Sequence, residues 1–151
     1  FCGQEIFLRG ILFGALHPLS SGTSHSAQYA VAGVMKAVND GTYNYRDDVL
    51  EYGEKAKLMK DAFTSNGFEF TYSEDLGEPI ADGFYFTYYY PGFTGAELLE
   101  KMLYYGISAI SLDTCGSTRQ GIRACTSLIQ RDEIPVLAER LKRFAEDHPI
   151  K

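Results

Sequence analysis

The segment 121–128 carries an arginine near the middle of a predicted β-strand, and this feature constrains the fold more than any other. Arginine is always charged, and burying it without a partner is costly. A strand that contains one therefore usually holds it over a cleft for an anion or a carboxylate. A second predicted strand, 107–112, lies just upstream, and a glycine-containing loop with Arg119 joins the two. The pattern predicts a carboxylate-binding site at Arg123.

Composition and charge exclude several classes of function. The 151 residues suffice for one domain with a core, and the net charge of −6 argues against non-specific binding to nucleic acid or to an anionic membrane surface. No apolar run is long enough to span a bilayer. Three widely spaced cysteines without a CxxC pair fit a reduced, cytoplasmic protein. The scattered histidines show no ligand spacing, so we expect no metal site.

Helical periodicity predicts four helices. Apolar residues between Ala27 and Val38 recur at the spacing of one buried face, with Ser24 or Ser26 as N-cap and Gly41 after the end. A second helix spans about 45–66 and places Glu51 and Lys55 on its exposed side. The capping box of residues 94–97 starts a third helix. The fourth has Asp132 as its cap, and its inward residues are Val136, Leu137, Leu141 and Phe144.

Strand patterns complete the predicted fold. Residues 68–72 and 84–90 alternate or are rich in aromatic β-formers, and an acidic, turn-rich linker joins them. With the two strands around Arg119, the predicted order from residue 23 onward is α-α-β-β-α-β-β-α. Because strands and helices do not alternate strictly, the order favours an α+β fold with a mainly antiparallel sheet covered by helices. Residues 1–22 show no clean period, and we expect this apolar segment to pack on another surface.

The element order, the stretch 104–112 and the stretch 121–127 together resemble the C-terminal portion of class I/II aminotransferases, which are fold type I enzymes. The resemblance covers about Ser20 to the C-terminus. It implies the C-terminal small domain of a transferase that depends on pyridoxal phosphate and moves an amino group between an α-amino acid and a 2-oxo acid. Residues 23–151 then form this domain, and residues 1–22 are a remnant of, or linker to, a large cofactor-binding domain.

The resemblance also implies site residues. The position that grips the substrate's α-carboxylate is Arg123, whose guanidinium matches the two oxygens of a carboxylate. Ser20 and Ser21 fall in the segment that reaches the cofactor phosphate in a neighbouring subunit, which implies a homodimer. The family's Schiff-base lysine lies upstream of the matched region, and no lysine here has such a setting. We therefore expect no catalytic residue in this chain and no transamination by the chain alone.

Each of these residues also has a plainer interpretation. Arg123 can form a structural salt bridge across the sheet, and Arg119 can be a solvated loop residue rather than a contact with substrate or phosphate. Ser20 and Ser21 can be a cap-forming loop. Cys115 and Cys125 can pack as small apolar side chains. The tyrosines of residues 85–90 divide between sheet surface and core, with one of them able to face the cleft.

Two further functions compete with the aminotransferase. One is a stand-alone amino-acid-binding or regulatory α+β module without catalysis. The other is an interaction domain whose first two helices form a dimer face. Neither the amino acid that serves as substrate nor the type of reaction on pyridoxal phosphate follows from the sequence, because fold type I hosts several chemistries.

Overall fold

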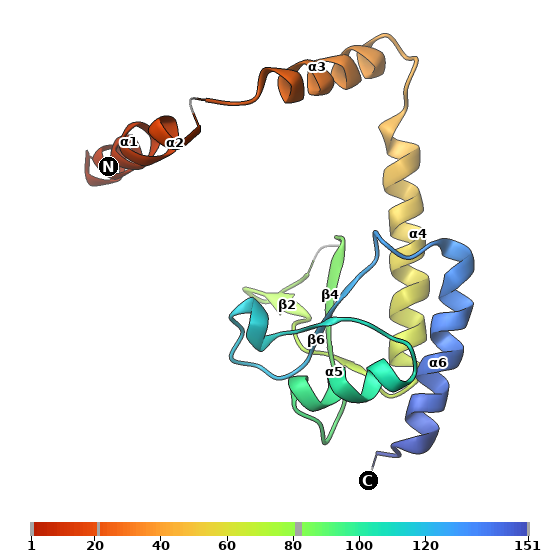
Figure 1. The fold of residues 1–151 in the computed structure, drawn as a ribbon. Helices are drawn as coiled ribbons and strands as arrows, with labels where there is room; N and C mark the ends of the chain where they lie inside the picture. Colours follow the sequence, from red (N-terminus) through yellow and green to blue (C-terminus); the bar gives the residue numbers. More distant parts are fainter. Residues whose placement is uncertain (1, 21, 81–82, 151) are drawn as a thin grey trace. The chain divides into compact units, whose positions relative to one another are not determined.

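A computed structural model describes residues 2–20, 22–80 and 83–150 (Figure 1). The chain divides into two compact units, one up to Tyr45 and one from Arg46. The predicted division at residue 22, between a remnant of a larger domain and a C-terminal domain, stays a prediction.

The first unit is helical throughout most of its length. Its elements are α1, Cys2–Ile11; the π-helix η1, Leu12–Leu16; α2, His17–Ser20; and α3, His25–Asn39. Residues 2–20 therefore form regular structure that their irregular hydrophobic pattern does not reveal. Several large apolar side chains of this segment are exposed, namely Phe7, Leu8, Ile11, Leu16 and Leu19.

Helix α3 confirms the predicted element but not its predicted buried face. It ends before Gly41, whose φ of 71° is the left-handed conformation that glycine adopts readily. Ser24 precedes the helix without making a side-chain cap, since its hydroxyl contacts that of Ser26 instead. The apolar stripe that includes Val34 and Met35 is exposed, because no described part of this unit packs over it.

The second unit has the predicted order of α-helices and main-sheet strands, with short elements between them. Its elements are α4, Tyr45–Thr64; β1, Glu69–Phe70; β4, Tyr85–Tyr89; α5, Gly95–Tyr104; β5, Ile110–Ser111; β6, Ile122–Cys125; and α6, Ile134–Asp147. A small hairpin, β2 (Glu74–Asp75) and β3 (Glu78–Pro79), lies in the predicted turn-rich linker. Its turn places Leu76 and Gly77 at positive φ.

The main sheet is antiparallel and has the strand order β1-β4-β6-β5. The predicted α+β class with an antiparallel sheet is therefore confirmed. Helices α4, α5 and α6 contribute the side chains that bury one face of this sheet. Strands β4 and β6 form its centre, and both edge strands, β1 and β5, are two residues long.

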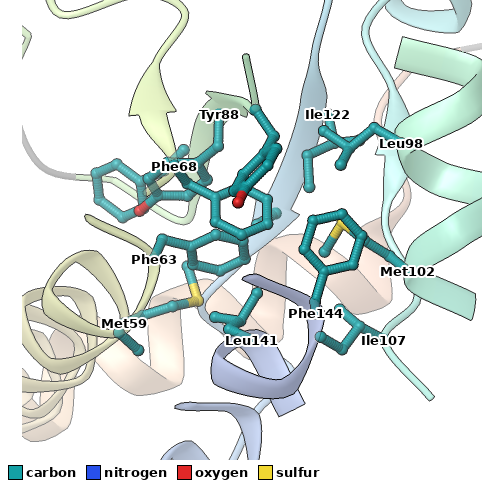
Figure 2. Packing of buried hydrophobic residues seen from close by; sticks show 14 of the residues in the cluster. Met59, Phe63, Phe68, Tyr88, Leu98, Met102, Ile107, Ile122, Leu141 and Phe144 are labelled. Atoms are coloured by element: carbon teal, nitrogen blue, oxygen red, sulfur yellow. The ribbon is translucent and has the colours of Figure 1, made fainter. Parts of the chain in front are cut away.

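Aromatic rings from helices and strands form the centre of the core (Figure 2). The ring of Phe63 in α4 stacks on that of Tyr88 in β4, with centroids 4.2 Å apart. The ring of Phe144 in α6 lies 5.1 Å from that of Tyr90 and 5.6 Å from that of Phe68. Burying each such side chain contributes on the order of 1.5–3 kcal/mol, so these contacts are the main link between α4, α6 and the sheet.

Of the two helix starts predicted in the C-terminal half, the structure confirms the cap of one and contradicts the cap of the other. The capping box of Thr94 and Glu97 is present at α5 as predicted. At α6 the prediction of Asp132 as the cap is wrong. A 3-10 turn, η3 (Arg131–Glu133), precedes the helix, and Gln130 and Glu133 form the capping box there. Because that box satisfies the free backbone groups one turn earlier, Asp132 has no capping role.

Two predicted orientations of side chains are also wrong. Lys55 is 7% exposed, and its Nζ donates to the carbonyl of Ile129 at 2.9 Å. Glu51 is exposed as predicted and pairs with Arg131 at 3.1 Å. The aliphatic stem of a lysine covers apolar surface readily, which explains its place on the inner side of α4. Val136 is 52% exposed rather than inward, since α6 turns Leu141 and Phe144 to the core.

Replacing Tyr88 by phenylalanine should stabilise the protein. The Tyr88 hydroxyl is buried without a hydrogen-bond partner among the described residues, and burial raises its pKa. A buried polar group without a partner costs about 1–3 kcal/mol, so Tyr88→Phe should raise the free energy of unfolding by about 1 kcal/mol in urea titrations.

Tyr90→Phe is the matched control for this substitution. The Tyr90 hydroxyl donates to the carbonyl of His148 at 2.7 Å, so removing it should lower the free energy of unfolding by about 1 kcal/mol. Equal losses in both variants would contradict the interpretation of Tyr88.

Candidate functional site

Strand β6 places Arg123 on the open face of the sheet. Burial alternates along the strand, so Ile122 and Ala124 face the core while Arg123 and Cys125 are only half-buried on the other side. Arg123 lies opposite Thr87 of β4 and Ile110 of β5. It therefore lies on an inner strand of the sheet, with a neighbouring strand on each side.

The residue before this strand has a specific backbone requirement. Gly121 has a φ of 142°, and a Cβ atom at this position would lie 2.5 Å from the carbonyl oxygen of Tyr88. A side chain here would therefore force β6 away from β4. The glycine two residues before Arg123 thus permits the close strand pairing that holds the arginine in place.

Arg123 has an aromatic neighbour, Tyr85. Its guanidinium lies over the ring of Tyr85, 4.5 Å from the ring centroid. Among the residues that the structure describes, the Arg123 side chain forms no ion pair or hydrogen bond. The alternative of a salt bridge across the sheet therefore finds no partner in the described ranges.

A pocket of about 820 Å³ opens beside this arginine. Tyr85, Arg123 and Cys125 line it, together with Ser108 before β5 and Arg140 of α6. Much of the remaining lining is apolar and comes from α4, β5, α6 and the segment after β6: Met59, Phe63, Ile107, Ala109, Ile110, Ala124, Leu128, Ile129, Val136 and Leu137. Apolar walls with a few polar groups are typical of sites for small organic molecules.

The other charged residues of this pocket have partners within the fold. Arg140 donates from Nη1 to the carbonyl of Gly106 at 2.6 Å. The Glu133 carboxylate accepts from the backbone N–H of Gln130 at 2.7 Å. In the described part of the chain, Arg123 is thus the pocket cation whose N–H groups have no acceptor.

The Cys125 thiol shares the electrostatic environment of Arg123. Its Sγ lies 3.0 Å from the Ser127 hydroxyl. Burial raises the pKa of the thiol, but hydrogen bonds with Ser127 and with the backbone of Leu128, and the charge of Arg123, outweigh it and hold the pKa below its usual range. This side of the pocket therefore favours negative charge.

Arg119 has a different setting from Arg123. It is exposed, but its Nη1 donates to the carbonyl of Thr71 at 2.8 Å, and its guanidinium lies over the ring of Tyr72. These contacts tie the loop before β6 to the segment that follows β1. Arg119 does not line the pocket of Arg123, so the structure does not bring the two arginines together there.

The predicted phosphate contacts fall where the structure describes little. Ser20 is the last residue of α2, and its side chain and the whole of Ser21 lie outside the described residues. The lysines have other contacts or positions. Lys55 binds the Ile129 carbonyl, Lys142 pairs with Glu146, and no described lysine lines the Arg123 pocket.

The tyrosine that borders the cleft is Tyr85, which the sequence did not single out from its neighbours. Tyr88 and Tyr90 are buried in the core, whereas Tyr85 and Tyr89 lie on the open face. Alternation along 84–90 separates the two sets. Choosing Tyr85 also requires the pairing of Tyr85 with Cys125, which is a long-range feature.

Comparisons with known proteins do not assign a family or a function to this chain. No protein-family profile matches this sequence, and a search of curated proteins finds no similar one. Within the described ranges, no group of histidine, cysteine, aspartate and glutamate side chains is arranged to hold a metal ion. None of the described helices combines the length and the apolar character needed to cross a bilayer.

The Cys125 thiol should titrate at a lower pH than the thiol of an ordinary cysteine. Because its pKa is lowered, its alkylation by iodoacetamide should reach half-maximal rate at a lower pH than that of a cysteine in a short peptide. Arg123→Gln removes a positive charge that makes the smallest of these contributions, after the hydrogen bonds of Ser127 and Leu128, so the midpoint should move slightly to higher pH. Peptide-resolved mass spectrometry separates this thiol from Cys115. A midpoint unmoved by Arg123→Gln would contradict the assigned cause.

Proposed function

We propose that this chain forms the C-terminal part of an aminotransferase that depends on pyridoxal phosphate, and that Arg123 binds the substrate's α-carboxylate. The observation that carries the proposal is the guanidinium of Arg123, which lines a pocket of about 820 Å³ without an acidic partner in the described ranges. The α+β fold with an antiparallel sheet is compatible with the small domain of such enzymes.

The chemistry of the pocket suits an anion such as a carboxylate. A guanidinium presents parallel N–H donors that match the two oxygens of a carboxylate, and such charge-assisted bonds are stronger than neutral ones. The lowered pKa of Cys125 reports a local environment that stabilises an anion. In an aminotransferase, a carboxylate held here orients every amino-acid or 2-oxo-acid substrate by the group that they share.

The described residues fit the carboxylate and not the cofactor. Pyridoxal phosphate, when bound, supplies the chemistry of amino-group transfer and needs a lysine to carry it. Lys55 donates to a backbone carbonyl, and no described lysine lines the pocket. In this proposal residues outside the chain supply most contacts with the cofactor, and Ser20 and Ser21 of this chain reach its phosphate in a neighbouring subunit of a homodimer. The contribution of this chain is to bind and orient the substrate.

The exposed apolar side chains of the first unit support the proposal that this chain is part of a larger assembly. Its exposed apolar side chains include Phe7 and Leu19 of the first helical segment and Met35 of α3. Water contact with so much apolar surface is unfavourable, so a further domain or a second subunit that covers it would stabilise these helices. The proposal assigns this surface to domain and dimer contacts.

A stand-alone amino-acid-binding module is the second candidate function. The observation that favours it is that the unit from Arg46 has a core and a pocket of its own. Such a module binds amino acids but has no use for pyridoxal phosphate. The two functions therefore differ in whether the protein in its cellular context binds that cofactor.

Arg123→Gln should abolish most carboxylate binding by the chain. The loss of a charged hydrogen-bond pair corresponds to about 1.5–3 kcal/mol, so the affinity for L-alanine in calorimetric or NMR titrations should fall roughly tenfold or more. Arg119→Gln is the matched control, since that arginine also lies over a tyrosine ring but does not line the pocket. Equal affinity of wild type and Arg123→Gln, with both folded by circular dichroism, would contradict the proposal.

The purified chain should not transfer amino groups by itself. Mixed with pyridoxal phosphate, an L-amino acid and a 2-oxo acid, it should show no turnover above that of the free cofactor, because no described lysine lines the Arg123 pocket. Product formation can be followed by mass spectrometry. Turnover that Arg123→Gln abolishes would show that the chain itself holds the catalytic lysine.

A further inference from the structure

We propose that Tyr85 is a positioning residue that holds the guanidinium of Arg123 in the orientation in which it meets a carboxylate. This inference rests on the proposed function of Arg123 and adds a residue that the sequence alone does not single out. Tyr85 lies on β4 and lines the same pocket as Arg123, with its ring beneath the guanidinium at 4.5 Å.

The strand register shows that this contact is diagonal. Arg123 lies directly opposite Thr87, whereas Tyr85 lies opposite Cys125. Diagonal neighbours on one face of an antiparallel pair lie within reach of long side chains. The Arg123 side chain therefore leans along the sheet toward the end of β6 that Cys125 occupies, and Cys125 and Leu128 line the pocket there. Tyr85 lies at the position where it can set this direction.

A comparison with Arg119 shows what the ring does for Arg123. Arg119 also lies over a tyrosine ring, at 4.7 Å from that of Tyr72, but it donates in addition to the Thr71 carbonyl. The Arg123 side chain has the ring contact without any hydrogen bond in the described part of the chain. A ring face attracts a cation without accepting all its N–H donors. Arg123 is thus held in place while its donors remain able to bind a ligand.

If the Arg123 side chain is already held in its binding orientation before a ligand arrives, binding is favoured. A long arginine side chain on an exposed face samples many rotamers, and fixing them on binding opposes association. A ring that confines the guanidinium beforehand removes part of this cost. The Tyr85 hydroxyl has no hydrogen-bond partner within the described residues, and the ring face alone carries the contact. Phenylalanine at position 85 should therefore hold Arg123 as Tyr85 does, whereas leucine should not.

The test uses the 151-residue chain, acetate as the probe and NMR observation of the Arg123 Nε–Hε group. Tyr85→Leu should weaken acetate binding about threefold, as expected from losing one exposed cation–π contact. It should also lower the order parameter of the Arg123 Nε–Hε group in the absence of acetate. Tyr85→Phe should leave both quantities near their wild-type values.

Tyr89→Leu is the matched control, because Tyr89 lies on the same strand and face but contacts Glu69 rather than an arginine. It should change neither quantity. A merely structural role of Tyr85 would lower stability without changing the Arg123 order parameter, and that result would overturn the inference. If Tyr85→Phe weakens binding as much as Tyr85→Leu, the hydroxyl touches the ligand, and positioning by the ring is likewise overturned.

The design separates failure of this inference from failure of the proposed function. If wild type binds acetate, Arg123→Gln does not, and Tyr85→Leu behaves as wild type in both measurements, the positioning role is wrong while the carboxylate site stands. If wild type and Arg123→Gln bind acetate equally, both the proposed function and the positioning role are wrong.

Discussion

The pairing of β4 with β6 is the interaction on which the rest of the structure depends. Its register sets Tyr88 opposite Ile122 on the core side and Thr87 opposite Arg123 on the open side. Because side chains alternate along a strand, a slip of one residue would bring Arg123 into the core and move Ile122 to the surface. The stacked rings of Phe63 and Tyr88 make that slip unfavourable. Packing on the helical side therefore determines what the opposite face presents.

The two faces of the sheet differ at β6, although the pocket draws on both of them, since core residues such as Phe63 and Ala124 also line it. The core face is buried by α4, α5 and α6 through apolar side chains. The opposite face keeps Arg123 and Cys125 half-buried next to a pocket.

Features that depend on residues close together in the sequence were predictable, and contacts between residues far apart in the sequence were not. The box of Thr94 and Glu97 involves residues three apart, so the sequence shows it directly. The order of helices and strands follows in the same way from periodicity. Lys55, in contrast, binds the carbonyl of Ile129, which lies 74 positions away. Nothing near Lys55 in the sequence indicates that partner, and the predicted exposed position of Lys55 was wrong.

The candidate site likewise contains a local feature that was predictable and a long-range contact that was not. Arg123 stands out because a charged residue in an apolar strand is unusual, and the open face on which it lies follows from alternation along β6. Its contact with Tyr85 depends on the register of two strands far apart in the sequence, so composition and spacing cannot supply it. Asp132 failed as a cap because Gln130 and Glu133 compete for the same turn, a choice that short-range rules do not resolve.

The shortness of the two edge strands has a consequence for solution behaviour. Unpaired backbone groups along a long, flat sheet edge invite strand addition by other molecules, which leads to aggregation. Here β1 ends after Phe70 and β5 after Ser111, each two residues long, and Glu69 adds a charge at one edge. A second sheet would find little backbone to pair with at either side. The sheet of the second unit therefore carries its own protection against fibre formation.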